Sequence, residues 1–310
     1  MTDTNTARFQ IRFWGVRGSY PTPGPQTVRY GGNTTCVEVE VGEHTLILDA
    51  GSGIIRLGHE LLRRSAGGDL NLALFITHGH GDHLLGIPFF SPLYEHSTSI
   101  DFFGPRLAGR SIEQLVTPYI SPPYFPVDMR SLPSHRTFHT ITDREEIIWN
   151  TGDIEPTVID ASPSPSKMER GSGGEAPEVR VIARNTSSHP LNGAVTYRIE
   201  YAGRRLVFAT DVEWREECEP GFLEFVEGAD LLIHDAQYTH DEYLEAKQGF
   251  GHSTLEMATE VAHLARVRKL ILFHHEPTYD DNKLDAVQAE ARARFANTSS
   301  ASEGMEINLL

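Results

Sequence analysis

Histidine and aspartate side chains gather in one short segment of this 310-residue chain. The segment reads THGHGDH at residues 77–83, so His78, His80, Asp82 and His83 lie within six positions. Glycines alternate with the first of these residues and remove side chains that would crowd a bound ion. Neutral imidazoles and a carboxylate are the ligands that zinc and similar divalent ions prefer. The segment therefore predicts a metal site.

Three more candidate ligands follow apolar runs in the second half of the chain. They are His189 in RNTSSHP, Asp211 at the end of LVFATD and His274 at the end of LILFHH. Taken alone, each would more often be a surface residue or a satisfied buried one. Their shared position after predicted strands favours a site, because open α/β sheets place ligands at the carboxyl ends of their strands.

Short and alternating apolar runs predict the elements that must position these residues. The strands expected are 9–14, 35–41, 45–48, 70–76, 178–183, 196–201, 205–208, 231–233 and 270–273, and the helices are 54–64, 254–265 and 280–295. The run at 70–76, directly before THGHGDH, has the continuous apolar character of a buried parallel strand. The pattern supports a layered α/β fold.

Local signals add detail to this organisation. Ser253 and Glu256 predict a capping box at the start of the helix 254–265. The Gly- and Pro-rich residues 15–32 form a loop long enough to be functional. We expect a single domain over 1–310, with a flexible, Pro-, Ser- and Gly-rich loop at 161–177.

The composition narrows the function classes. Asp and Glu number 43 against 27 Lys and Arg, so the net charge is −16. Repulsion from phosphates argues against a general nucleic-acid or anionic-membrane binder, unless a local basic or metal-rich site makes the electrostatic potential positive there. Two cysteines, Cys36 and Cys218, are too few for a disulfide framework. No apolar run approaches the length of a membrane span, so we expect a cytoplasmic protein with no membrane partner.

The complete motif set resembles the metallo-β-lactamase superfamily. H-x-H-x-D-H is followed by a later His, an Asp after a hydrophobic strand and a last His. ADLLIHDAQY at 229–238 and GHSTLEMATEVAHLARVRKLILFHHEP at 251–277 are similar to the branch that holds the tRNA 3′-processing endonuclease RNase Z and its phosphodiesterase relatives. RFWGVRGSYPTPG and YGGNTTC also resemble that branch. The resemblance implies a four-layer αββα sandwich, with metals at one edge between two mixed sheets.

The resemblance also implies two divalent metal ions, for which zinc is expected and manganese or iron would also suit the ligands. One ion would be held by His78, His80 and His189, and the other by Asp82, His83 and His274, with Asp211 bridging. His274 is preferred to its neighbour His275 because it directly follows the strand.

Two buried residues are expected to support the ligands. Asp49 would orient the histidine-rich loop, although a simple turn aspartate in DAGSG is an equal alternative. His234 is expected to be a buried support and not a ligand.

In the resembling branch, a hydroxide that bridges two metals attacks phosphorus and an acid protonates the leaving oxygen. The motif GHST supplies His252 as that general acid, and Asp235 would hold its imidazole in the right tautomer. We place Asp82 with these two among the catalytic residues as well as among the ligands. The alternative, that His252 and Asp235 are purely structural, stays open.

The acid indicates the reaction class. A β-lactam or thioester releases a nitrogen or a thiolate and needs no such histidine, whereas a phosphodiester releases a poor alkoxide. The tRNA-processing members carry an extended arm between the third-ligand His and the bridging Asp, but His189 and Asp211 are only 22 positions apart here. We therefore expect a small phosphodiester substrate such as a cyclic nucleotide.

The alternatives are an RNase Z-like endonuclease that acts on RNA 3′ ends and a thioester or acyl hydrolase of the same fold. Outside the enzymes, a regulatory module with an inactive site is the competing hypothesis, and the complete ligand set argues against it. A homodimer is expected, in which the proline- and aromatic-rich residues 117–133 form either a subunit contact or a pocket wall. Residues 121–126, SPPYFP, could stack a base.

Overall fold

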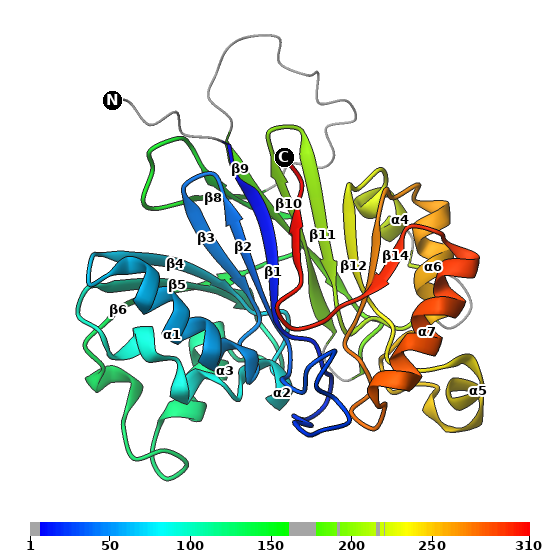
Figure 1. The fold of residues 1–310 in the computed structure, drawn as a ribbon. Helices are drawn as coiled ribbons and strands as arrows, with labels where there is room; N and C mark the ends of the chain where they lie inside the picture. Colours follow the sequence, from blue (N-terminus) through cyan, green and yellow to red (C-terminus); the bar gives the residue numbers. More distant parts are fainter. Residues whose placement is uncertain (1–6, 161–177, 191–192, 215–217, 220) are drawn as a thin grey trace.

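Two mixed β-sheets pack face to face at the centre of the fold, and helices cover their outer faces (Figure 1). The computed structural model describes residues 7–160, 178–190, 193–214, 218–219 and 221–310. This arrangement confirms the predicted four-layer αββα sandwich. The loop predicted at 161–177 lies outside the described residues. Among the described residues, no helix is both long enough and apolar enough to cross a membrane.

Within the described residues, the first sheet has seven strands in the order β15-β1-β2-β3-β4-β5-β6. Their bounds are β1 Phe9–Gly15, β2 Cys36–Val41, β3 His44–Leu48, β4 Leu70–Phe75, β5 Thr98–Pro105, β6 His135–Ile141 and β15 Glu306–Asn308. Strand β4 pairs in parallel with β3 and with β5, as its apolar run predicted.

The second sheet, over the same described ranges, has eight strands in the order β14-β13-β12-β11-β10-β9-β7-β8. Their bounds are β7 Glu145–Trp149, β8 Thr157–Asp160, β9 Val179–Thr186, β10 Ala194–Tyr201, β11 Arg204–Ala209, β12 Leu231–Asp235, β13 Leu270–Phe273 and β14 Thr298–Ser300. Strands β11 to β14 run parallel to one another. The predicted hairpin joins β10 to β11, which pair in antiparallel register from Tyr201 and Arg204 onward.

Helices α1 and α3 cover the first sheet, and α4, α6 and α7 cover the second (Figure 1). The helices are α1 Gly53–Ser65, α2 Gly81–Leu84, α3 Ile112–Val116, α4 Phe222–Val226, α5 His240–Glu242, α6 Leu255–Leu264 and α7 Asp281–Arg294. Short 3-10 turns are η1 Ile87–Phe89, η2 Ser91–Tyr94, η3 Thr117–Ile120 and η4 Met129–Ser131, and η5 Tyr243–Lys247 is a π-helix.

The capping prediction for α6 was wrong. Thr254 is the N-cap and accepts a hydrogen bond from the Met257 amide, while the Ser253 hydroxyl donates to the Val212 carbonyl.

The core between the sheets consists of large apolar side chains from both inner faces. Phe13, Phe75, Tyr197, Phe208 and Phe273 are all buried in it. Burying such side chains stabilises the sandwich by about 25 cal/mol per Å² of apolar surface. The packing fixes the distance between the two sheets, and with it the distance between the loops at the sheet edges.

Backbone strain marks the edge at which the parallel strands end. Asp49 follows β3, Asp211 follows β11 and His274 follows β13, and their φ angles are 61°, 56° and 60°. These are left-handed conformations, which cost a residue with a side chain roughly 1–2 kcal/mol. Such strain clusters at functional sites, where the surrounding fold holds it in place.

Candidate metal centre

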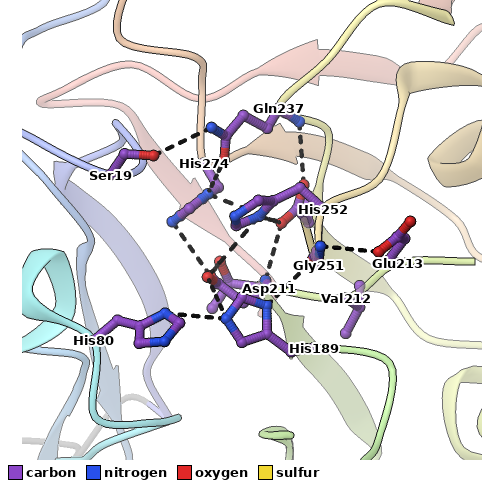
Figure 2. Close-up of polar contacts among 12 residues, drawn as sticks. Ser19, His80, His189, Asp211, Val212, Glu213, Gln237, Gly251, His252 and His274 are labelled. Atoms are coloured by element: carbon purple, nitrogen blue, oxygen red, sulfur yellow. Dashed lines mark hydrogen bonds and ion pairs between the residues drawn. The ribbon is translucent and has the colours of Figure 1, made fainter. Parts of the chain in front are cut away.

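The histidine-rich segment turns sharply as it leaves β4. His78 and His80 lie in the loop, and Asp82 and His83 lie in α2. A side chain at Gly79 would reach Leu115 of α3 at 3.4 Å, so the loop packs directly on that helix. His189, Asp211 and His274 approach from the second sheet (Figure 2).

The predicted ligands meet in two groups at this edge. Ligand atoms of His78, His80, His189 and Asp211 lie within 4.8 Å of one another, and so do those of Asp82, His83 and His274. The structure therefore brings together every residue that the resemblance assigned to a metal. No predicted ligand lies elsewhere.

The Asp211 carboxylate stands between the two groups. Its Oδ2 lies 3.5 Å from His78 Nε2 and 3.8 Å from His189 Nε2. Its Oδ1 lies 3.3 Å from His83 Nε2 and 3.3 Å from His274 Nε2. With one oxygen toward each group, this carboxylate is placed to bridge two cations.

The side chains fit divalent ions. Within the described structure, the Nε2 atoms of His78 and His83 are buried and have no hydrogen-bond partner. A buried polar nitrogen without a partner is costly, and a cation in each group would satisfy the histidine nitrogen of that group. Burial holds the pKa of His78 well below its ordinary value, so its imidazole is neutral, as a ligand must be.

Oxygen acceptors orient three ligand histidines from behind. His83 Nδ1 donates to Asp49 at 2.7 Å, and His274 Nδ1 donates to the Gln237 side-chain oxygen at 2.9 Å. His189 Nδ1 donates to the Gly251 carbonyl at 3.0 Å. Each bond fixes the tautomer and turns Nε2 toward the cluster, which is the usual support for ligand histidines. The geometry of Asp49 matches its predicted orienting role.

The loop between β1 and β2 reaches the site. The Ser19 amide donates to Asp82 Oδ2 at 2.8 Å, and the Ser19 hydroxyl accepts from Gln237 Nε2 at 3.3 Å. Sequence reasoning predicted that this loop was functional but singled out neither residue. Backbone amides and neutral side chains carry no ligand signal, so only the fold reveals them.

Glu213 is another residue that sequence reasoning missed. Its carboxylate is buried, and it accepts hydrogen bonds from the amides of Gly249 and Gly251 at 2.6 and 2.9 Å and from the Tyr243 hydroxyl at 2.9 Å. It lies two positions after Asp211 and holds the loop that carries His252 (Figure 2). Its position close to a predicted ligand was the only available signal.

His252 and Asp235 form a pair at the rim of the cluster. His252 Nδ1 donates to Asp235 Oδ2 at 2.8 Å, and its ring stacks on that of His274 with 4.9 Å between centroids. Burial opposes a charge on this imidazole, but the Asp235 carboxylate outweighs it and raises the pKa of His252 to about 9. The imidazole therefore carries a proton near neutrality, as a general acid must.

Two neighbouring histidines face away from the cluster. His275 Nε2 donates to the Ala301 carbonyl at 2.9 Å, and the residue belongs to neither ligand group. His234 accepts from Trp214 Nε1 at 3.1 Å and donates from Nδ1 to the Asp235 carbonyl at 2.7 Å. His274 is thus the histidine of its pair that joins the site, and His234 supports the strand end.

Comparisons with known proteins agree with this fold and site. Residues 44–275 match the family model described as a Beta-lactamase superfamily domain. The Ribonuclease Z of Thermoplasma acidophilum is 26% identical over 317 residues, which cover 97% of this chain and 96% of that protein. The fold is similar to that of YhfI from Bacillus subtilis, with a TM-score of 0.65, 18% identity and coverage of 98% and 100%. It is also similar to the short form of human tRNase Z, with a TM-score of 0.63, 19% identity and coverage of 97% and 99%.

The chain belongs to the metallo-β-lactamase superfamily. Several further relatives named Ribonuclease Z match over nearly their whole length, which places the chain in the RNase Z-like branch. With its cluster of histidines and aspartates, the protein is a metal-dependent hydrolase.

Replacing His78 or Asp211 by alanine is expected to remove metal and activity together, because each change deletes a ligand atom from the cluster. The metal content of the dialysed variants should fall below the roughly two ions per chain expected for the wild type. The exposed His96→Ala variant is the matched control and should keep its metal. A His78→Ala protein with full metal content would contradict the assignment.

Replacing Glu213 by glutamine is expected to lower kcat roughly 10- to 100-fold, the range for residues behind metal ligands. The metal content should stay unchanged, because the replacement removes no ligand atom. The Gly249 and Gly251 amides donate to different oxygens of Glu213, so the amide group of glutamine sets a donor against one of them and the His252 loop shifts. Steady-state kinetics beside metal analysis checks this, with the exposed Glu224→Gln variant as control. An unchanged kcat would show that the hydrogen bonds from the Gly249 and Gly251 amides to Glu213 are dispensable for catalysis.

Proposed function

We propose that the protein hydrolyses phosphodiester bonds in RNA, in the manner of the RNase Z relatives it resembles. This replaces the cyclic nucleotide expected from the sequence as the leading substrate, because relatives named Ribonuclease Z match over almost the whole chain. The observation that carries the proposal is the His252–Asp235 pair, held 2.8 Å apart at the rim of the metal cluster.

In the proposed arrangement, His78, His80 and His189 would hold one divalent ion, and Asp82, His83 and His274 would hold the other, with Asp211 available to both. Zinc suits these ligands best, and manganese or iron would also suit them. When bound, such a pair supplies a water of lowered pKa and polarises a phosphoryl oxygen.

The chain's own contribution to bond cleavage is a proton. With Nδ1 bonded to Asp235, His252 has Nε2 left to donate to the leaving oxygen of the substrate. The Asp235 carboxylate stabilises the imidazolium before transfer and is itself fixed by the amides of Gln237 and Ser253, each at 3.1 Å. An alkoxide is a poor leaving group, so this proton is needed for a phosphodiester and not for a thioester.

A small phosphodiester is the second candidate, and one observation favours it. Strands β10 and β11 are joined by only Ala202 and Gly203, both with positive φ, as in a tight hairpin turn. The span between His189 and Asp211 therefore has no room for the arm that the resemblance implies for tRNA-processing members. The net charge of −16 also disfavours long-range attraction of RNA.

A substrate panel tests the proposal. We expect the zinc- or manganese-loaded protein to cleave RNA with a 3′ extension at a higher kcat/KM than cyclic mononucleotides or cyclic dinucleotides. End-labelled transcripts resolved on sequencing gels give the position and rate of cleavage. Faster hydrolysis of a cyclic nucleotide would establish the second candidate, and thioester cleavage with no phosphodiester turnover would exclude both.

Replacing His252 by alanine is expected to retain metal yet slow RNA cleavage by roughly two to four decades, the usual cost of losing a general acid. The same change should slow the hydrolysis of bis(p-nitrophenyl) phosphate much less, because p-nitrophenolate is a good leaving group that needs no proton. Kinetics on both substrates separates these effects. Equal losses on both substrates would indicate a structural role for His252.

A further inference from the structure

A row of aromatic and cationic side chains leads from the proposed acid to the surface. The Tyr238 ring is 5% exposed, and its centroid lies 5.8 Å from that of His252. The Lys247 ammonium lies 5.1 Å from the Tyr238 ring and 5.3 Å from the Phe250 ring. Phe250 ends the row with 53% of its surface exposed. None of these three side chains has a part in the chemistry described above.

The backbone holds this row in place. The amides on both sides of Phe250, at Gly249 and Gly251, donate to the buried Glu213 carboxylate. The Tyr243 hydroxyl bonds the same carboxylate and so anchors η5, which carries Lys247. Hydrogen bonds therefore fix the backbone on both sides of Phe250, and its exposed ring projects from an ordered part of the loop. Such a ring offers a fixed, flat face on which a planar group can stack.

The charge of Lys247 is available to an anion. Among the residues that the structure describes, no carboxylate lies within ion-pair distance of its ammonium. The ammonium contacts the rings of Tyr238 and Phe250. The Lys247 ammonium thus lies beside an exposed aromatic ring. Together they match a nucleotide, which offers a flat base and a phosphate.

We propose that Lys247 and Phe250 form a binding subsite for the nucleotide that carries the leaving oxygen. The base stacks on Phe250, and the phosphate on the far side of that nucleotide pairs with Lys247. The subsite is on the His252 side of the metal cluster, where the acid must meet the leaving oxygen. The inference rests on the proposed phosphodiesterase function and adds which part of the RNA substrate the protein recognises.

Binding of fluorescent single-stranded RNA to metal-loaded His252→Ala protein tests the subsite, because that background turns over slowly. In it, Phe250→Ala should weaken binding about 5- to 150-fold, the range for loss of one stacked base, and Phe250→Trp should bind at least as tightly as the parent. Lys247→Met should make the negative slope of log K against log salt concentration shallower by about 0.7, the value for one phosphate contact on a single strand. Phe250→Ala should leave that slope unchanged.

The neighbouring exposed variants Glu245→Gln and Gln248→Ala are the controls and should bind as the parent does. Binding within twofold of the parent for both Phe250→Ala and Lys247→Met would overturn the subsite, even if RNA is cleaved. A halved molecular mass for Phe250→Ala would also overturn it, by showing that a second copy covers the ring. If the wild-type enzyme cleaves only cyclic phosphodiesters but both variants weaken RNA binding, the RNA proposal fails and the subsite stands.

Discussion

The buried negative charge of Asp211 is the constraint on which the rest of the site depends. Its carboxylate is almost fully buried, and each of its oxygens faces imidazole nitrogens of a different group at 3.3 to 3.8 Å. Asp82 adds a second carboxylate among the ligands, and neutral imidazoles cannot balance the negative charge of these two side chains. A buried charge must be paired or bind a metal. Two divalent cations, one in each group, would satisfy the Asp82 and Asp211 carboxylates and the buried Nε2 atoms of His78 and His83.

The sandwich makes this concentration of charge possible. Apolar packing between the sheets brings the strand ends of both halves to one edge, and three residues there adopt left-handed backbone conformations. Asp49, Gln237 and Glu213 then lock the ligands and the acid loop from behind. The stability of the core thus supports a strained, highly charged edge, and the chemistry is placed there and not in the core.

Most of the site could be predicted from the sequence, because ligand residue types at strand ends leave a clear pattern. The seven ligand candidates and the His252–Asp235 pair all converge. The edge strands β6 and β8 were not predicted, since their side chains are polar or exposed and they lack the apolar run of β4. Strands β5 and β7 were also missed, since polar residues interrupt or shorten their apolar runs. Ser19, Gln237 and Glu213 were missed because they act through an amide, a neutral side chain and a remote carboxylate. The N-cap of α6 was placed one residue early, since Ser253 and Thr254 are chemically equivalent caps.

Anomalous diffraction from zinc-loaded crystals tests the central claim most directly. The account predicts two peaks per chain about 3.5–4 Å apart. One should lie among His78, His80 and His189 and the other among Asp82, His83 and His274, with an Asp211 oxygen on each. A different group of side chains, Asp211, Asp235, His252 and His274, also lies within 4.8 Å and could hold an ion. A peak bound by His252 and Asp235 would contradict the account, because a histidine that binds metal cannot serve as the acid.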